Sequence, residues 1–200
     1  MNHTLLAWFF GCSVVLFFVI APALANDWPV KEQVKTYPVR GSDPLALYRS
    51  IEDNGPKTSL GTRAIALTEF KLLWRRDYRP DGTDCVLASA TPQLTITTTL
   101  PKPAGKLSKE LASRWKPFVE GITAHEAVHG TMIRALTEEI INKTVGTRIE
   151  NDPACKKIRP VILEKVKATY AVHLARSRDF DKVEMGRGGN VEMLIRALVE

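Results

Sequence analysis

A long stretch of alternating apolar and polar residues constrains the fold of this chain more than any other feature. Between Thr62 and Tyr78, apolar side chains recur at every second position, and charged residues take the positions between them toward the end of the stretch. The alternation resumes between Cys85 and Pro101, after the turn sequence RPDGTD, with leucine and isoleucine set against threonine. A period of two is typical of a strand with one buried face. The sequence therefore predicts two long antiparallel strands joined by a turn.

Helical patterns flank this strand pair. Before it, we expect Ser42 to cap a short amphipathic helix with Pro44 in its first turn and Leu45, Tyr48 and Ile51 on one face. After it, a linker rich in proline and glycine leads into a half with helical periodicity to the end of the chain. The predicted fold class is α+β: an N-terminal helix and a long antiparallel strand pair, followed by a helical half.

Two prolines fall inside these predicted elements. Pro92 cannot donate a ladder hydrogen bond, so we expect the second strand to lie at an edge or to carry a bulge there. Pro117 removes an amide and would clash with the carbonyl one turn back. We therefore expect a kink or a new start at this position, with the next helix running from Pro117 to Gly146.

Residues 1–25 are predicted to be a secretory signal peptide. They contain the uncharged apolar run LLAWFFGCSVVLFFVI, and Ala23 and Ala25 then form the small-x-small pattern of a cleavage site before Asn26. The start of the chain carries little positive charge, which leaves an uncleaved membrane anchor as the alternative. We expect a periplasmic or secreted protein in which residues 26–200 form one domain, because about 175 residues suffice for one compact core.

Export also bears on the cysteines and on the charge. Cys85 and Cys155 remain after the leader and are expected to form a disulfide, with two buried free thiols as the alternative. The net charge of +6 includes basic clusters that could attract phosphate, anionic lipid or an anionic cell-wall polymer, although most such clusters are solvated surface. The sequence has no zinc knuckle, phosphate loop or aromatic-basic ladder, so nucleic acid is not an expected partner.

The segment HEAVH, residues 125–129, is the strongest chemical signal. Apolar residues recur in steps of three or four on both sides of it, and His125 and His129 occupy the same stripe. A helix places positions four apart on one face, so both imidazoles should point inward about one turn apart. Glu126 falls at the edge of the stripe, where its carboxylate could reach a water in front of the imidazoles. Two neutral imidazoles, an open position for water and a carboxylate base are what an HExxH zinc hydrolase requires.

The alternative interpretation is a pair of core histidines hydrogen-bonded to nearby carbonyls. Burying two imidazoles side by side without a cation or donors is costly, because each unpaired polar group loses its hydration. We therefore favour a metal site with Zn²⁺ as the cofactor.

Several segments together resemble the bacterial domain-of-unknown-function 922 family, which is described as predicted secreted zinc-dependent proteases. They are the sequence YPVRGSDPLALYRSI, the strand ending in WRRDY, the later ITTTLP, and the HEAVH helix followed by a cysteine. The resemblance covers most of residues 26–200. It implies a periplasmic or secreted metallopeptidase with His125 and His129 as zinc ligands and Glu126 as the catalytic base.

The third zinc ligand is less clearly indicated. In the family, an aromatic-Asp pair precedes a threonine and then a His-Gly pair; this chain keeps Phe180-Asp181 but has Glu184 near the threonine position and no histidine after it. The resemblance therefore favours Asp181. Helical periodicity also turns His173 inward, and Glu184 is a third option. We rank Asp181 first.

These inferences predict an exported zinc metallopeptidase that hydrolyses peptide bonds, with Glu126 as general base and a peptide or protein, for example in the cell envelope, as substrate. The membrane would be a partner only through an uncleaved N-terminal segment. One alternative is a zinc amidase that acts on cell-wall peptides. The other is a non-catalytic envelope protein that binds metal or a partner through a degenerate site.

Overall fold

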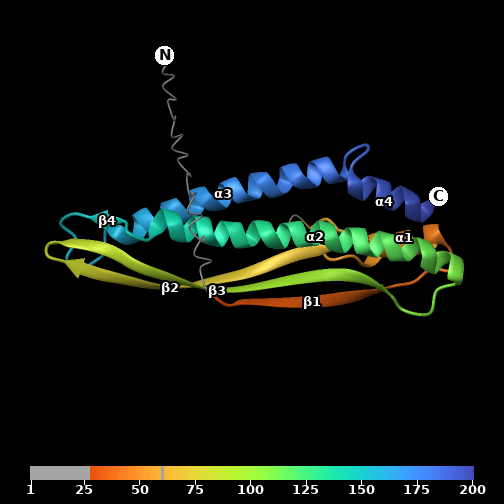
Figure 1. Cartoon of the computed structure of the whole chain (residues 1–200), viewed down its shortest axis with the longest axis horizontal. Helices are drawn as coiled ribbons and strands as arrows, with labels where there is room; N and C mark the ends of the chain where they lie inside the picture. The colour runs from red at the N-terminus through yellow and green to blue at the C-terminus, as the bar shows by residue number, and fades with distance from the viewer. Residues whose placement is uncertain (1–27, 60) are drawn as a thin grey trace, which may run out of the picture.

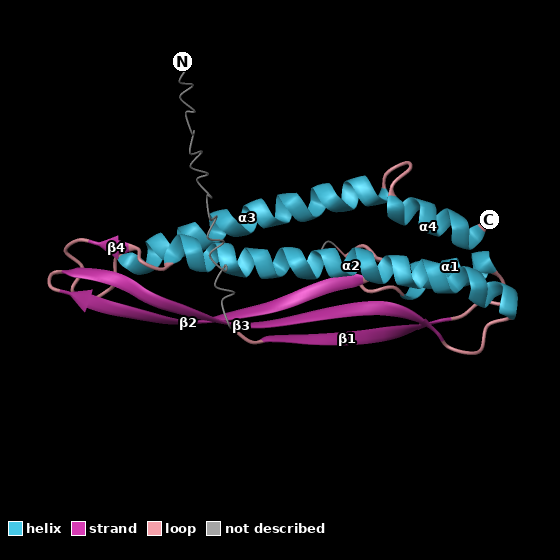
Figure 2. Cartoon of the chain, in the orientation of Figure 1, coloured by secondary structure: helices cyan, strands magenta, loops and turns pink. Residues whose placement is uncertain are grey.

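The computed structural model describes residues 28–59 and 61–200, so the predicted signal peptide or anchor lies outside the described residues. The elements, in chain order, are β1 (Val30–Val39), α1 (Pro44–Asn54), β2 (Leu67–Asp81), β3 (Asp84–Pro103), α2 (Lys109–Thr144), β4 (Arg148–Ile149), α3 (Ile158–Met185) and α4 (Asn190–Val199). The long strands form one layer, and α2 and α3 both lie on one side of it (Figures 1 and 2). The fold is α+β with a mixed sheet, and none of the described helices is both long and apolar enough to span a bilayer.

The predicted strand pair is the framework of the sheet. β2 and β3 pair antiparallel from the turn at Gly82 to the partners Leu67 and Thr99. Gly82 has a φ of 63°, a left-handed conformation that glycine adopts without a steric penalty. β1, which the sequence analysis did not predict, pairs parallel to β3 and makes β3 the central strand in the order β1-β3-β2.

Pro92 lies where β3 has only one neighbour. It pairs with Trp74 of β2, whereas the pairing with β1 begins at Leu94. The prediction of an edge is thus confirmed locally, because the missing amide hydrogen of Pro92 can face an unpaired side. A β-bulge also occurs nearby, between Asp77 and Tyr78 of β2.

Three details of the predicted helices differ from the structure: the cap and the buried face of the first helix, and the start of the second. In α1, the cap is Asp43 rather than Ser42, because the Asp43 carboxylate accepts a hydrogen bond from the Ala46 amide at 2.9 Å. Leu45 is exposed, and the buried leucine is Leu47, four residues before Ile51. α2 runs unbroken through Pro117. Pro117 lies on the exposed side of α2, so water can reach the carbonyl one turn back that has lost its amide donor.

The core holds α3 to the rest of the fold at both ends. At its start, the predicted disulfide between Cys85 and Cys155 is present and is packed with Leu87, Ile158 and Ile162. Beyond its end, α4 packs on α2, where Gly121 leaves room for the side chain of Leu194. Between these ends, α3 lies along α2, and this placement brings its C-terminal turns to the HEAVH segment.

Removing the disulfide should destabilise the protein strongly. The bond closes a loop with a sequence separation of 70 residues. We expect the double substitution Cys85→Ala and Cys155→Ala to lower the free energy of unfolding by about 4 kcal/mol, because the unfolded chain gains the entropy of that loop. Urea unfolding under oxidising conditions measures the change. The wild-type protein in reducing agent should match the double variant, and an unchanged urea midpoint in both would contradict the prediction.

Candidate metal centre

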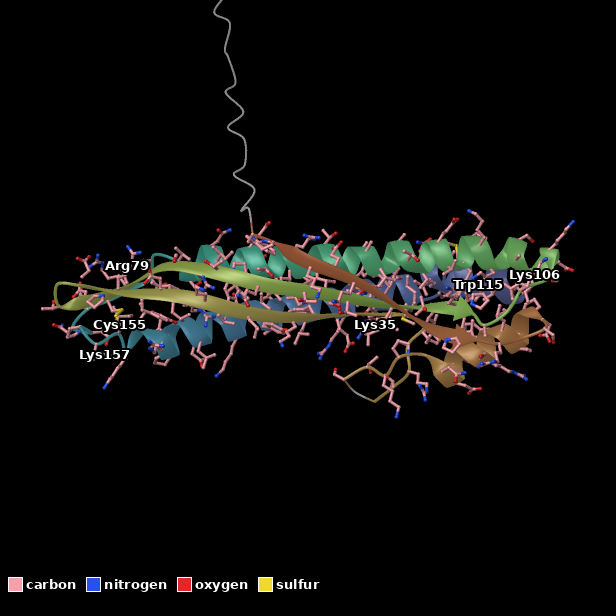
Figure 3. The ribbon with its side chains drawn as sticks, turned by 90° about the horizontal axis from the view of Figure 1, so that it is seen from below. Lys35, Arg79, Lys106, Trp115, Cys155 and Lys157 are labelled. Atoms are coloured by element: carbon pink, nitrogen blue, oxygen red, sulfur yellow. A yellow bond between two sulfur atoms is a disulfide. The ribbon has the colours of Figure 1, made fainter. Side chains whose placement is uncertain are left out.

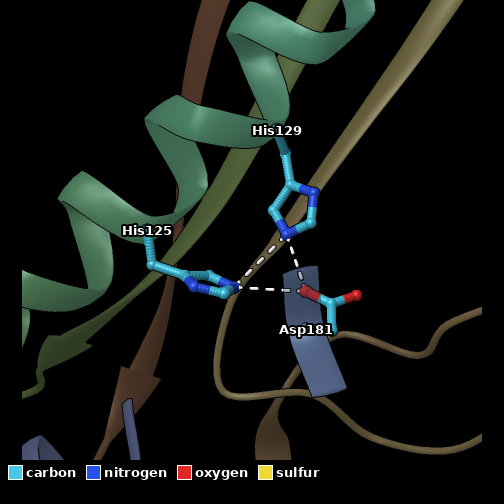
Figure 4. Close-up of side chains that lie close together, drawn as sticks. All are labelled: His125, His129 and Asp181. Atoms are coloured by element: carbon cyan, nitrogen blue, oxygen red, sulfur yellow. Dashed lines mark hydrogen bonds and ion pairs between the residues drawn. The ribbon is translucent and has the colours of Figure 1, made fainter. Parts of the chain in front are cut away.

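Two imidazoles and one carboxylate converge between α2 and α3. His125 and His129 project from α2 one turn apart, and Asp181 faces them from α3 (Figure 4). The two Nε2 atoms are 3.2 Å apart. Asp181 Oδ1 lies 2.9 Å from His129 Nε2 and 3.4 Å from His125 Nε2. These three residues form the one group in the described part of the chain whose ligand atoms are close enough to hold a metal ion together.

The separations fit the face of a tetrahedron. For zinc bonds of about 2.0–2.1 Å, tetrahedral geometry places neighbouring ligand atoms about 3.3 Å apart. The three measured separations lie between 2.9 and 3.4 Å. The ligand atoms are therefore already spaced for a small divalent cation, and the fourth vertex faces away from all three side chains.

The remaining nitrogen of each imidazole faces a polar side chain of α3. Ser177 Oγ lies 3.2 Å from His129 Nδ1. Glu184 Oε2 lies 3.6 Å from His125 Nδ1. An acceptor at Nδ1 favours the tautomer in which Nε2 is free to bind a metal, and the Ser177 hydroxyl can accept from His129 Nδ1. Glu184 is too distant for a hydrogen bond, so His125 Nδ1 has no hydrogen-bond partner among the described residues. Ser177, Asp181 and Glu184 are spaced by four and three residues, so one face of α3 supplies all three groups.

The ring of Phe180 packs against both imidazole rings. It stacks on His125 with centroids 4.8 Å apart and an angle of 18° between the planes. It also meets the ring of His129 edge to face at 5.3 Å. Packing of this kind limits ring rotation, so both members of the Phe180-Asp181 pair act on the same two histidines.

The electrostatics of the cluster favour a positive charge between these groups. Burial by itself would raise the pKa of Asp181, but hydrogen bonds from His125 and His129 outweigh it and hold that pKa at about 2. Burial by itself would lower the pKa of His125, whereas its hydrogen bond to Asp181 and the charge of Glu126 raise it. The negative charge of the Asp181 carboxylate can be neutralised either by a proton on the imidazoles or by a divalent cation.

Glu126 lies deeper than the sequence predicted. It is only 6% exposed, at the junction of α2 with β2, where Thr68 Oγ1 donates to the Glu126 backbone carbonyl at 3.4 Å. Among the described residues, none donates a hydrogen bond to its Oε2. Burial raises the pKa of this carboxyl group, which makes it a stronger base than an exposed glutamate.

A cavity of about 320 Å³ gives access to these groups. His125, Glu126, His129 and Asp181 are among its lining residues. Residues 62–68, which lead into β2, also line it, as do Met185 from α3 and Val191 from α4. The cavity therefore brings the three ligand atoms and the buried carboxylate to one accessible space.

The family model for a bacterial protein of unknown function, DUF922, matches residues 34–189. The chain belongs to the DUF922 family. The match confirms the resemblance seen in the sequence, and the matched range contains α2 and α3, from which the centre is built. Comparisons with curated proteins and with solved structures find no match for this DUF922 protein.

The other two candidate ligands are not part of the group that could hold a metal ion. His173 is buried, and its ring meets Phe70 and Tyr170 edge to face at 6.1 and 6.2 Å. Glu184 lies on α3, with its Oε2 3.6 Å from His125 Nδ1. Ser177 was missed by the sequence analysis, although its spacing of four from Asp181 was a usable signal.

Zinc titration should separate Asp181 from His173. We expect Asp181→Asn to weaken zinc binding by more than about 100-fold, which exceeds the loss typical of a residue that only orients a ligand. Calorimetry or competition with a coloured chelator measures the affinity. Asp179→Asn, an exposed neighbour on α3, is the matched control and should bind normally. A larger loss in His173→Ala than in Asp181→Asn would reverse the ligand assignment.

Proposed function

We propose that this DUF922 protein is an exported zinc metallopeptidase, with zinc held by His125, His129 and Asp181 and with Glu126 as general base. The main support is the convergence of two Nε2 atoms and one carboxylate oxygen at tetrahedral spacing. The buried Glu126 carboxylate lines the same cavity. Export is supported by the apolar leader and by the buried disulfide, because such bonds persist in oxidising compartments.

Each residue of the proposed centre has its own role in hydrolysis. Zinc in such a site supplies a Lewis acid that polarises a carbonyl and makes water a stronger acid. Glu126 has the raised pKa of a buried carboxyl group, so it can take a proton from the attacking water and return it to the leaving amine. The hydrogen bond of Ser177 at His129 Nδ1 and the stacking of Phe180 on His125 keep the imidazoles in place during this cycle.

The sheet offers a place for an extended substrate. Among the described residues, the strand order β1-β3-β2 leaves one side of β2 without a strand partner. The first residues of β2, Leu67 and Thr68, line the cavity of the metal centre. An extended peptide that adds to this edge would therefore pass close to the centre, with main-chain hydrogen bonds that do not depend on its sequence.

Glu126→Gln tests the catalytic part of the proposal. We expect the variant to keep one zinc per chain but to lose hydrolysis by about 10²–10⁴-fold, because the amide cannot accept the proton. Casein and purified muropeptides are the substrates to compare. Glu138→Gln, an exposed position on the same helix, is the matched control. Hydrolysis of muropeptides alone would favour a cell-wall amidase, and bound zinc without any hydrolysis would favour a metal-binding protein without catalysis.

Glu184→Gln and Ser177→Ala test the positioning of the imidazoles. Ser177→Ala should weaken zinc affinity by about 10–100-fold, the usual loss when the second nitrogen of a histidine ligand loses its partner. Glu184→Gln should weaken it less, because Glu184 Oε2 lies 3.6 Å from His125 Nδ1 and makes no hydrogen bond to it. The absorption spectrum of the cobalt-substituted protein should also change, since it reports ligand geometry. Glu164→Gln, on the exposed side of α3, should change neither the affinity nor the spectrum. Wild-type zinc affinity in both variants would show that the contacts at Nδ1 do not position the ligands.

A further inference from the structure

No helix of residues 28–59 and 61–200 packs on the middle of the sheet side that faces away from α2 and α3. Viewed from this side, the strands lie in front of α2 and α3, and α1 lies beside one end of the sheet (Figure 3). On β3, the buried residues Ala90, Pro92, Leu94 and Ile96 point toward the helices. The residues between them point away from α2 and α3, and every one is polar and uncharged: Thr91, Gln93, Thr95, Thr97 and Thr99.

Four cations flank this polar row on the same side of the sheet. Lys31 and Lys35 come from β1, and Lys71 and Arg75 come from β2; all four are exposed. The register places a cation beside every fourth residue of β3: Lys35 beside Thr99, Lys31 and Lys71 on either side of Thr95, and Arg75 beside Thr91. Four residues of a strand span about 13 Å, so the positive charges follow the central strand at regular steps.

The four cations are not neutralised by the protein itself. None of them forms an ion pair with any residue in the described ranges 28–59 and 61–200. Glu69 is the one acidic residue beside them on this part of β2. Lys31 and Lys71 are separated by a single strand, about 10 Å from backbone to backbone, so their like charges repel. Binding of an anion would relieve this repulsion.

We propose that this surface, called the cationic face and defined by Lys31, Lys35, Lys71 and Arg75 around the threonine row, binds a linear polyol-phosphate polymer. The cations would neutralise phosphate groups along the chain and release its counterions. The threonine hydroxyls would donate hydrogen bonds to phosphate and polyol oxygens between them. The cationic face lies on the opposite side of the sheet from the metal centre, so this proposal does not depend on zinc or on peptidase activity.

The other common polyanions fit this face less well. Single-stranded nucleic acid is held by aromatic side chains on which bases stack, but the aromatic Phe70 of β2 points to the helix side and stacks on Tyr170. A membrane surface would need apolar side chains to insert. Leu73 is the one large hydrophobic residue of the described chain that is exposed among the cations. A polymer with phosphates but no bases matches a row of charges and hydroxyls.

Fluorescence anisotropy with labelled poly(glycerol phosphate) tests the proposal. The purified protein should bind the polymer at low salt and lose affinity as salt rises. In the double variant Lys31→Gln and Lys71→Gln, we expect the dissociation constant to rise about tenfold or more and the salt slope to fall by about 1.4, the value for two lost phosphate contacts on a single-stranded polyanion. An unchanged thermal midpoint would show that the fold is intact.

The matched control is Lys106→Gln with Lys109→Gln, which removes the same charge from exposed positions near the start of α2. It should leave binding within about twofold, since the lost charges contact no phosphate. Equal losses in the two double variants would overturn the proposal, because net charge alone would then explain the binding. It would also be overturned by absence of binding at low salt, or by oligothymidylate or phosphatidylglycerol vesicles binding as tightly with the same dependence on Lys31 and Lys71.

Discussion

The contact between the Asp181 carboxylate and the two imidazoles of α2 is the constraint on which the candidate site depends. Neither helix can form the centre alone, since α2 carries both histidines and α3 carries Asp181 and the groups at Nδ1. Three polar groups packed this closely are unfavourable unless a charge balances them. The packing of α3 on α2 therefore brings the carboxylate and the imidazoles into an arrangement that a divalent cation would stabilise.

The sheet and the disulfide make that arrangement possible. β2 and β3 are long enough to give α2 and α3 a common support. The disulfide fixes the start of α3 beside β3, and α4 closes the structure against α2. With the helix held at both ends, the position of Asp181 depends on rigid helical geometry and not on a flexible loop. Such support is what a preorganised site requires.

Local patterns in the sequence predicted much of this structure. Alternation predicted the strand pair, helical spacing predicted that His125 and His129 share a face, and the even pair of cysteines predicted the disulfide. β1 was missed because it is an edge strand of mixed polarity whose parallel partner is distant in the sequence. The contacts of Ser177 and Glu184 depend on how α3 docks on α2, which no local period encodes. The new helix start predicted at Pro117 is absent because a helix tolerates a lost amide on its hydrated side.

The spacing of polar groups on α3 also determines which insertions would leave these groups facing the imidazoles. Each residue of a helix advances about 100° around its axis, so one residue inserted between the disulfide and Ser177 would rotate Ser177, Asp181 and Glu184 together away from the imidazoles. The same insertion in the Gly186–Gly189 connection, beyond Met185, would leave all three in phase. Length variation among sequences that keep this centre is therefore expected after α3 and not within it.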